Sequence, residues 1–304
     1  MNSECLKEYC FVSIKGFGDL TIALSMLRRV PDPFLDHFSV LIGSHLKGLV
    51  DALNVKLQIR LVDVGSEGGA AIFALRTRGI LAGLRNAIWL RSSVGAAIQN
   101  KPLTLVFDKL SWRERFMSAG ARAVAIPPHQ NNVYIAYEFF LKSLFPILPA
   151  PQQGVVTGKL VGIFPITSLN KKNLTATVIN QITSICRSKG FDPVVFLLDG
   201  ERLDGPVSAP IINIDRNFTA LMGVIDSLAG AICADSLPAH LSAYLHKHVF
   251  VVSPTPNTYW FPQSVYVNDY WGLFKDVDAL NRSLDKFFSS LSLDSTLSEK
   301  LNAG

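Results

Sequence analysis

Residues 231–253 read AICADSLPAHLSAYLHKHVFVVS. Two short apolar runs, Ala231–Ala234 and Val249–Ser253, are typical of buried β-strands, and Leu237–Leu245 between them has the pattern of an amphipathic helix. A helix that connects two neighbouring strands in this way makes those strands parallel. The segment therefore predicts an α/β fold with a parallel sheet.

The same alternation extends along the rest of the chain. Further strands are expected at Phe11–Ile14, Phe38–Ile42, Val55–Leu61, Leu103–Phe107, Ala121–Ile126, Leu160–Phe164, Val194–Leu198 and Ile211–Ile214. Further helices are expected at Asp19–Arg29, from Ser44, and at Ala70–Leu90, Thr175–Lys189, Phe218–Leu228 and Asp276–Leu291. Residues 145–154 carry three prolines and a glycine, a composition typical of a linker. We therefore predict two α/β domains, residues 1–150 and residues 151–304.

The composition suits two compact domains. The chain has 304 residues, of which 49% are hydrophobic and 17% charged, enough to fill two cores. It has no run of the roughly 18 apolar residues that a membrane span needs, and its start lacks the pattern of a secretion signal. The four cysteines have no zinc-type spacing, so we expect reduced thiols and a cytoplasmic location.

The positive charge is concentrated in the first half of the chain. Residues 1–150 contain 17 Lys and Arg against 11 Asp and Glu, whereas residues 151–304 contain 12 against 13. This imbalance favours an anionic partner, such as nucleic acid, a phospholipid surface or an acidic glycan, although an ordinary solvated surface would also account for it. Nucleic acid is discounted, because the basic residues neither interleave with exposed-looking aromatic residues nor form a known motif.

The first candidate site is the turn Ile14–Asp19, which leads from a strand into a helix. Its glycines, Gly16 and Gly18, are expected to let the backbone turn sharply and a ligand approach closely. The G-x-G fragment lacks the third glycine of a dinucleotide fingerprint, so it is weak support for NAD. Asp19 has two interpretations, an N-cap of the helix or a catalytic base.

The second candidate is the loop Phe164–Leu174, at the carboxyl end of a strand. It carries two hydroxyl groups, Thr167 and Ser168, and two ammonium groups, Lys171 and Lys172. Hydroxyls can donate hydrogen bonds to a diphosphate, and a lysine can neutralise its charge as it leaves. A solvated loop without function is the other interpretation.

The third candidate, Ala234–His240, is the most specific. Asp235 or Ser236 can cap the helix that follows, and Pro238 is tolerated in its first turn. Free N–H groups and the helix dipole make such a helix start a natural phosphate site. His240 falls about one turn into the helix, where a lone histidine is either structural or part of that site.

These three segments, in this order, resemble the signatures of glycosyltransferase family 9, the bacterial lipopolysaccharide heptosyltransferase family. The matching residues are Gly18 and Asp19, then Thr167, Ser168 and Lys172, then Asp235, Ser236 and His240. Weaker similarities are Phe107–Arg115, Val251–Asn257 and Trp260–Pro262. Two residues depart from the family pattern: Leu174 replaces an aromatic residue, and Leu237 replaces a glycine.

The resemblance implies a GT-B fold, in which two Rossmann-like domains face each other across a cleft. The first domain would bind the acceptor and the second the nucleotide sugar. Asp19 would be the general base of an inverting, single-displacement transfer. The implied donor-binding residues are Thr167, Ser168, Lys172, Asp235, Ser236, Leu237 and His240. Weaker candidates for acceptor binding are Lys15, Lys109 and Arg113.

The resemblance also implies the substrates. The co-substrate would be a nucleoside-diphosphate sugar, with ADP-heptose favoured, and no cofactor is expected. The acceptor would be an anionic glycolipid or glycan such as lipopolysaccharide core, reached from the cytoplasmic side with peripheral contact to the inner membrane surface. No Asp-x-Asp motif lies in a suitable loop, so no obligatory metal is expected.

Two other functions fit the same architecture. A nucleotide-sugar epimerase would release an altered nucleotide sugar and need no second substrate. A non-catalytic nucleotide-sugar or glycan-binding relative is suggested by Leu237, whose side chain could crowd the phosphate site, or whose backbone N–H could still serve it.

Overall fold

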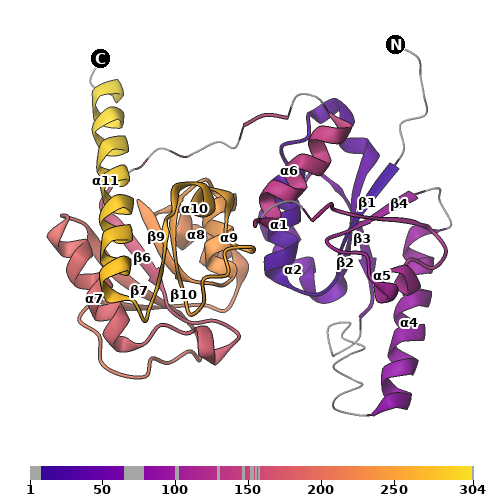
Figure 1. Ribbon diagram of the computed structural model, residues 1–304, viewed down its shortest axis with the longest axis horizontal. Helices are drawn as coiled ribbons and strands as arrows, with labels where there is room; N and C mark the ends of the chain where they lie inside the picture. Colours follow the sequence, from indigo (N-terminus) through magenta and orange to yellow (C-terminus); the bar gives the residue numbers. More distant parts are fainter. Residues whose placement is uncertain are drawn as a thin grey trace. The chain divides into compact units, whose positions relative to one another are not determined.

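The computed structural model shows two α/β units (Figure 1). It describes residues 8–64, 79–99, 103–128, 131–145, 148–150, 154, 156 and 158–302, with side chains up to residue 292. One unit comprises Met1–Gln130 and Ile135–Ala150, and the other comprises Asn131–Tyr134 and Pro151–Gly304. The part of the predicted helix Ala70–Leu90 that precedes residue 79 lies outside the described residues.

The first unit is built on a five-stranded parallel sheet with the order β3-β2-β1-β4-β5. Its strands are β1 Glu8–Ser13, β2 Phe38–Gly43, β3 Gln58–Val62, β4 Leu103–Phe107 and β5 Arg122–Ala125. Its helices are α1 Phe17–Leu27, α2 Lys47–Leu53, α4 Ile80–Ile98, α5 Trp112–Met117 and most of α6 Val133–Leu144. Short 3-10 turns occupy Asp32–His37 and Ser44–Leu46.

Helices cover both faces of this sheet. Alternate residues of a strand point to opposite faces, and β1 shows the result. Cys10 packs in one cluster with Leu90 and Val94 of α4. The next residue, Phe11, contacts the rings of Tyr137 and Phe140 of α6 on the other face. The sheet is therefore buried on both sides, as parallel sheets generally are.

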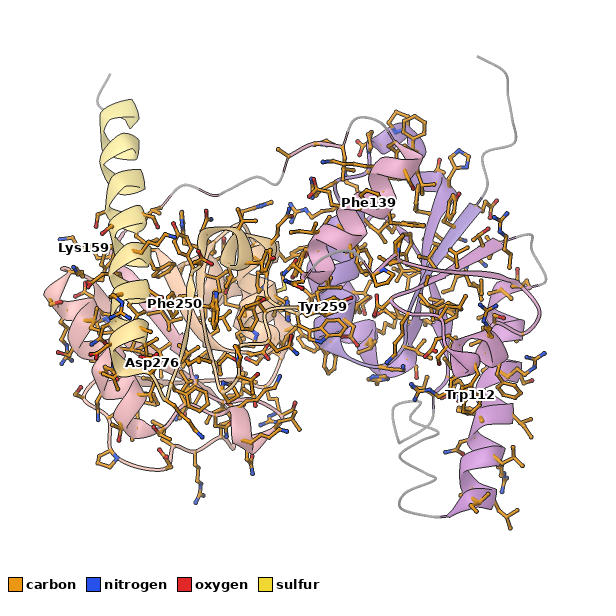
Figure 2. All side chains as sticks on the ribbon, in the orientation of Figure 1. Trp112, Phe139, Lys159, Phe250, Tyr259 and Asp276 are labelled. Atoms are coloured by element: carbon orange, nitrogen blue, oxygen red, sulfur yellow. The ribbon has the colours of Figure 1, made fainter. Side chains whose placement is uncertain are left out.

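The second unit contains a six-stranded parallel sheet with the order β11-β10-β9-β6-β7-β8. Its strands are β6 Leu160–Phe164, β7 Asp192–Leu198, β8 Ile211–Ile214, β9 Gly230–Ala234, β10 His248–Ser253 and β11 Trp271–Leu273. Its helices are α7 Ala176–Ser188, α8 Phe218–Asp226, α9 Leu237–Tyr244, α10 Gln263–Asn268 and α11 Val277–Asn302, with a 3-10 turn at Asn170–Lys172. Phe250 of β10 belongs to a core shared with α7 and α11 (Figure 2).

The start of helix α6 belongs to the second unit, although most of the helix belongs to the first. Asn132 is completely buried, and its Nδ2 atom donates hydrogen bonds to the carbonyl oxygens of Thr258 and Phe261, at 3.3 and 2.9 Å. The backbone N–H of Val133 donates to the carbonyl of Tyr259 at 2.8 Å. The second unit therefore includes a short segment that comes from the middle of the chain.

The predicted strands are all present, with bounds shifted by up to three residues. The sequence analysis did not predict α5, α6, α10 or β11. It also ended the last helix at Leu291, whereas α11 extends to Asn302. Gly190 ends α7 as predicted, because its φ of 80° is one that glycine adopts without strain.

The packing of α11 on β11 generates a stability prediction. A Cβ atom at Gly272 would lie 2.7 Å from Leu280 Cδ1 and 3.2 Å from the Leu280 Cα. We expect Gly272→Ala to lower the free energy of unfolding by about 1–3 kcal/mol, because overpacking must displace α11. The matched control is Gly223→Ala in exposed α8, which meets nothing within 4 Å and should stabilise by up to ~1 kcal/mol. Urea unfolding measures both, and equal stability of the two variants would contradict the prediction.

Candidate functional site

The first candidate turn, between β1 and α1, does not use its glycines as expected. Gly16 occupies the N-cap position of α1 with φ −136° and ψ 149°, an extended conformation open to any residue. Gly18 lies inside the helix. Neither has a positive φ among the described residues, so the expectation that these glycines allow a sharp turn is wrong. The space beside Gly16 is taken by the Asp19 carboxylate, whose Oδ2 would lie 3.5 Å from an added Cβ.

Asp19 is not a helix cap. It is the third residue of α1, and the N-cap position belongs to Gly16, without any side-chain cap. The carboxylate is half-buried. Among the residues that the structure describes, none donates a hydrogen bond to it. The capping interpretation of Asp19 is therefore wrong, and its position has no structural explanation of that kind.

A second carboxylate, Asp108, contributes to the raised pKa of Asp19. Asp108 directly follows β4, which is the sheet neighbour of β1. Burial, the largest cause, and the negative charge of Asp108 together raise the pKa of Asp19 to about 6, and the charge of Lys15 opposes this shift. Two like charges with restricted access to water disfavour each other's ionised form, so this pair holds its protons more tightly than exposed aspartates do.

Asp108 is itself held in place by a hydrogen bond. The Tyr137 hydroxyl donates to Asp108 Oδ1 at 2.6 Å. Burial raises the pKa of Asp108, whereas this hydrogen bond and the charges of Lys15 and Lys109 lower it. The sequence analysis did not select Asp108, although its position directly after a strand, like that of the Ile14–Asp19 turn, was a signal that could have found it.

The three weaker acceptor candidates are not equivalent. The charges of Lys15 and Lys109 act on the Asp19–Asp108 pair. Lys15 is exposed, and its Nζ lies 3.7 Å from the buried Glu114 Oε1. Arg113 lies in the first turn of α5, and its charge is not among those that shift the pKa of either aspartate. The structure therefore places Lys15 near both aspartates and Lys109 near Asp108.

In the second unit, the loop after β6 is organised by its own hydrogen bonds. The Thr167 hydroxyl donates to the carbonyl of Leu169 at 2.8 Å and accepts from its N–H at 3.0 Å. The N–H of Thr167 donates to Asn173 Oδ1 at 2.8 Å. Ser168 is exposed at the tip of this turn. The Thr167 side chain thus shapes the loop, and Ser168 is the hydroxyl that faces solvent.

Lys172 connects this loop to the segment after β9. Its Nζ lies 2.6 Å from Asp235 Oδ2, with 30% and 16% of the two side chains exposed. Strands β6 and β9 are sheet neighbours, so both loops leave the same edge of the sheet. The neighbouring Lys171 is exposed. The second and third candidate segments therefore form one site, with Lys172 as its cation.

The start of helix α9 carries no side-chain cap. Ser236 occupies the N-cap position, but its hydroxyl donates back to the carbonyl of Ala234 at 3.0 Å. Asp235 is engaged with Lys172. The expectation that Asp235 or Ser236 caps the helix is therefore wrong. Leu237 is the first helical residue and is half-buried. The first-turn N–H groups receive no side-chain oxygen from Asp235 or Ser236, although the N–H of Ala239 donates to the Ser236 carbonyl at 3.1 Å.

His240 is buried one turn into α9. Its Nδ1 is hydrogen-bonded to the Tyr134 hydroxyl at 3.0 Å, and the two rings stack with centroids 6.2 Å apart. The pKa of His240 is lowered to about 4, mainly by burial; the charge of Asp235 opposes this shift and the charge of Lys172 adds to it. His240 is therefore neutral at neutral pH. Its partner, Tyr134, lies at the start of α6, in the part of that helix that belongs to the second unit, and no local sequence signal indicates this pairing.

Neither a metal cluster nor a membrane span occurs in the part of the chain that the structure describes. No group of three or more His, Cys, Asp or Glu side chains could hold a metal ion among these residues. None of the described helices is both long and apolar enough to cross a bilayer. The described cysteines, Cys10, Cys186 and Cys233, are free and buried.

The lowered pKa of His240 generates a prediction for acid stability. An unfolded histidine has a pKa near 6.5, so between about pH 6.5 and 4 the unfolded chain binds a proton that the folded protein does not. His240 should therefore contribute a loss of up to about 3 kcal/mol as the pH falls through this range, whereas Asp19, whose raised pKa favours the folded state at low pH, contributes in the opposite direction in the parent and in both variants alike. His240→Gln, which does not titrate, should lose less, whereas His37→Gln in the first unit should behave as the parent does. Urea unfolding at pH 7, 5 and 4 measures the free energy of unfolding of the three proteins. Identical losses of stability in all three would contradict the prediction.

No protein-family model matches the sequence, and no curated protein matches it significantly. Solved structures are similar in fold. A glycosyl transferase family 9 protein from Veillonella parvula has a TM-score of 0.61 at 10% identity, over 95% of this chain and 98% of that one. The E. coli heptosyltransferase WaaC with ADP has a TM-score of 0.61 at 11% identity, over 93% and 99%.

A third similar structure is the dodecameric iron-containing heptosyltransferase TibC in complex with ADP-D-beta-D-heptose. Its TM-score is 0.53 at 10% identity, over 96% of this chain and 81% of that one. At these identities the likeness concerns the fold. The fold expected from the three loop segments is thereby confirmed: this chain has the two-unit α/β fold of family 9 glycosyltransferases.

Proposed function

We propose that this protein is a glycosyltransferase that takes its sugar from a nucleoside diphosphate. The observation that carries the proposal is the Asp19–Asp108 pair, which lies at the carboxyl edge of a parallel sheet. The pKa of the Asp19 carboxyl is raised to about 6, and none of the described residues donates a hydrogen bond to it. Such a group is unfavourable for the stability of the fold but useful for proton transfer. Ligands of open α/β sheets bind at this edge.

Asp19 would act as the general base. A carboxylate with a pKa near 6 is still largely ionised at neutral pH, and it is a stronger base than an ordinary aspartate. It would take the proton of an acceptor hydroxyl as that hydroxyl attacks the anomeric carbon. Lys15 and Lys109 would attract an anionic acceptor to this edge. The first unit would thus bind the acceptor.

The second unit would bind the donor. Lys172 and the open N–H groups of α9 can neutralise and hydrogen-bond a diphosphate. Asp235 positions the Lys172 ammonium group, and neutral His240 fills the space beneath, tied to Tyr134. Ser168 would contribute a hydroxyl donor, and Thr167 would shape the loop. These groups stabilise a leaving group as its negative charge develops.

The finer details of the proposal follow from the family resemblance. We propose a single displacement with inversion, ADP-heptose or a related donor, and an anionic glycolipid acceptor such as lipopolysaccharide core. Lys172 and the helix start would supply the charge stabilisation that a metal provides elsewhere, so we propose transfer without an obligatory metal. Activity that survives chelation would support this, and activity restored only by iron or another metal would contradict it.

Leu237 favours a second candidate function, nucleotide-sugar binding without transfer. The half-buried side chain stands at the helix start that the diphosphate would approach. A screen of nucleotide sugars by thermal unfolding tests donor binding directly, because a ligand at 100 times its Kd stabilises by about 2.7 kcal/mol. A donor that binds but is neither transferred nor epimerised would favour this second candidate, and a released altered nucleotide sugar would indicate an epimerase.

The base prediction concerns Asp19→Asn. The amide keeps the shape of the side chain but cannot accept the proton, so transfer should fall by roughly 10²–10⁴-fold. Donor affinity should change little, because the proposed donor site belongs to the other unit. Transfer rates and donor titrations on both proteins measure this. Normal transfer by Asp19→Asn would exclude the general-base role.

The control for this base is Asp108→Asn. Transfer by the parent should rise with pH through about 6, as Asp19 loses its proton. The neutral amide at position 108 removes the charge that raises the Asp19 pKa, so the acid limb should move to lower pH. If transfer by Asp108→Asn falls at the same acidic pH as transfer by the parent, Asp108 does not influence the pKa of Asp19.

The donor-site prediction compares two adjacent lysines. Lys172→Gln removes the cation held by Asp235 and should lower turnover by roughly 10²-fold, on the scale of one lost charge-stabilising group. Lys171→Gln removes an exposed cation from the same turn and should remain close to the parent. The two turnover numbers are the measurement, and equal effects would mean that only the general charge of the loop matters.

A further inference from the structure

Helix α4 presents large apolar side chains to solvent. Leu81 is 84% exposed and Ile80 is 77% exposed, and Leu84, Ile88 and Trp89 follow over the next turns. Four of these five, at positions 80, 81, 84 and 88, share one side of the helix by their spacing. A contiguous apolar surface of this kind on a folded protein generally marks a site of interaction. We name these five residues the α4 tip.

The α4 tip is the end of a helix whose other end is anchored in the core. The buried residues Leu90, Val94 and Ile98 pack against the sheet and lie in the second half of α4. In Figure 1, the beginning of α4 extends past the ends of the strands of its own unit. The helix therefore projects an apolar end while its base remains fixed.

A neighbouring tryptophan enlarges the same surface. Trp112 is the first residue of α5, is 77% exposed and lies beside α4 (Figure 2). Arg91 of α4 fixes the two helices to each other, because its guanidinium group donates to the Phe116 carbonyl and lies 5.0 Å from the centre of the Phe116 ring. Tryptophans are enriched at membrane–water interfaces, where their amphipathic rings fit.

The α4 segment and the segment that contains α5 are mainly basic. Segments 79–99 and 109–117 contain five basic residues, Arg85, Arg91, Lys109, Arg113 and Arg115. Their single acidic residue, Glu114, is buried and accepts hydrogen bonds from Ser111. Exposed aliphatic and tryptophan side chains on segments rich in basic residues complement an anionic lipid surface, which offers an apolar interior below negative headgroups.

We propose that the α4 tip and Trp112 dock this protein onto an anionic phospholipid bilayer. The apolar side chains would enter the boundary between headgroups and acyl chains, and the surrounding arginines would contact the lipid phosphates. A second copy of the chain fits less well, because a symmetric contact would bring the basic residues of these segments close to their own copies. This docking does not depend on the proposed sugar transfer, although it would place the first unit beside a lipid-linked acceptor.

The first test removes the apolar contact. Leu81→Gln with Leu84→Gln keeps good helix formers, and the matched control is Ile211→Gln with Ile212→Gln on β8, which are 48% and 47% exposed in the parent. The full chain is sedimented with vesicles of phosphatidylcholine and phosphatidylglycerol. We expect the α4 pair to lose at least about tenfold in vesicle partitioning, and the β8 pair to lose little. Equal losses, or no binding by the parent, would overturn the proposal.

The second test removes charge. Arg85→Gln with Arg115→Gln should weaken binding to these vesicles by roughly tenfold or more, and Arg202→Gln with Arg282→Gln in the second unit should not. Binding by the parent should fall in pure phosphatidylcholine. If the parent were a dimer in solution that Leu81→Gln with Leu84→Gln converts to a monomer, the tip would bind a second copy and the proposal would be wrong. Thermal shifts with nucleotide sugars on the same variants separate this result from the donor proposal, since they should match the parent.

Discussion

Both units depend on parallel sheets whose two faces are buried. Every residue of β2, β9 and β10 is buried, so polar side chains find few places along these strands. The backbone hydrogen bonds of a parallel ladder satisfy the strands themselves, and covering helices remove both faces from water. The titratable groups of the candidate site, Asp19, Asp108, Lys172 and Asp235, accordingly lie after the strands and not within them. The candidate chemistry of this protein is a consequence of that constraint.

The charged groups at the carboxyl edges of the two sheets attract each other in one unit and repel each other in the other. In the second unit Lys172 and Asp235 offset each other, and such a partly exposed pair contributes ~1 kcal/mol or less to stability. In the first unit Asp19 and Asp108 repel each other, and only Tyr137 donates a hydrogen bond to the pair among the described residues. A fold selected for stability alone would not keep two half-buried like charges adjacent, and strained electrostatics of this kind cluster at functional sites.

The sequence predicted what depends on neighbouring residues and missed what depends on the sheet order. Apolar runs located the strands, because a doubly buried strand is apolar throughout. Helix α6 was not predicted. The residues at its start, Val133–Tyr134, and the aromatic residues Tyr137 and Phe140 do not show the polar pattern that marks a surface helix. Asp108 reaches Asp19 only because β4 pairs with β1, and these residues lie far apart along the chain. Tyr134 meets His240 because the start of α6 belongs to the second unit, and these two residues are also far apart along the chain.

Leu237 illustrates how a departure from a family pattern can be judged physically. As the first helical residue of α9, it adopts a backbone conformation without positive φ, so a leucine there introduces no strain that a glycine would relieve. Its backbone N–H still points along the helix axis with those of the first turn, where Ser236 leaves them without a side-chain cap. The substitution therefore leaves the electrostatics of an anion site intact. What it changes is the space in front of that site, and hence the size of the group that can approach it.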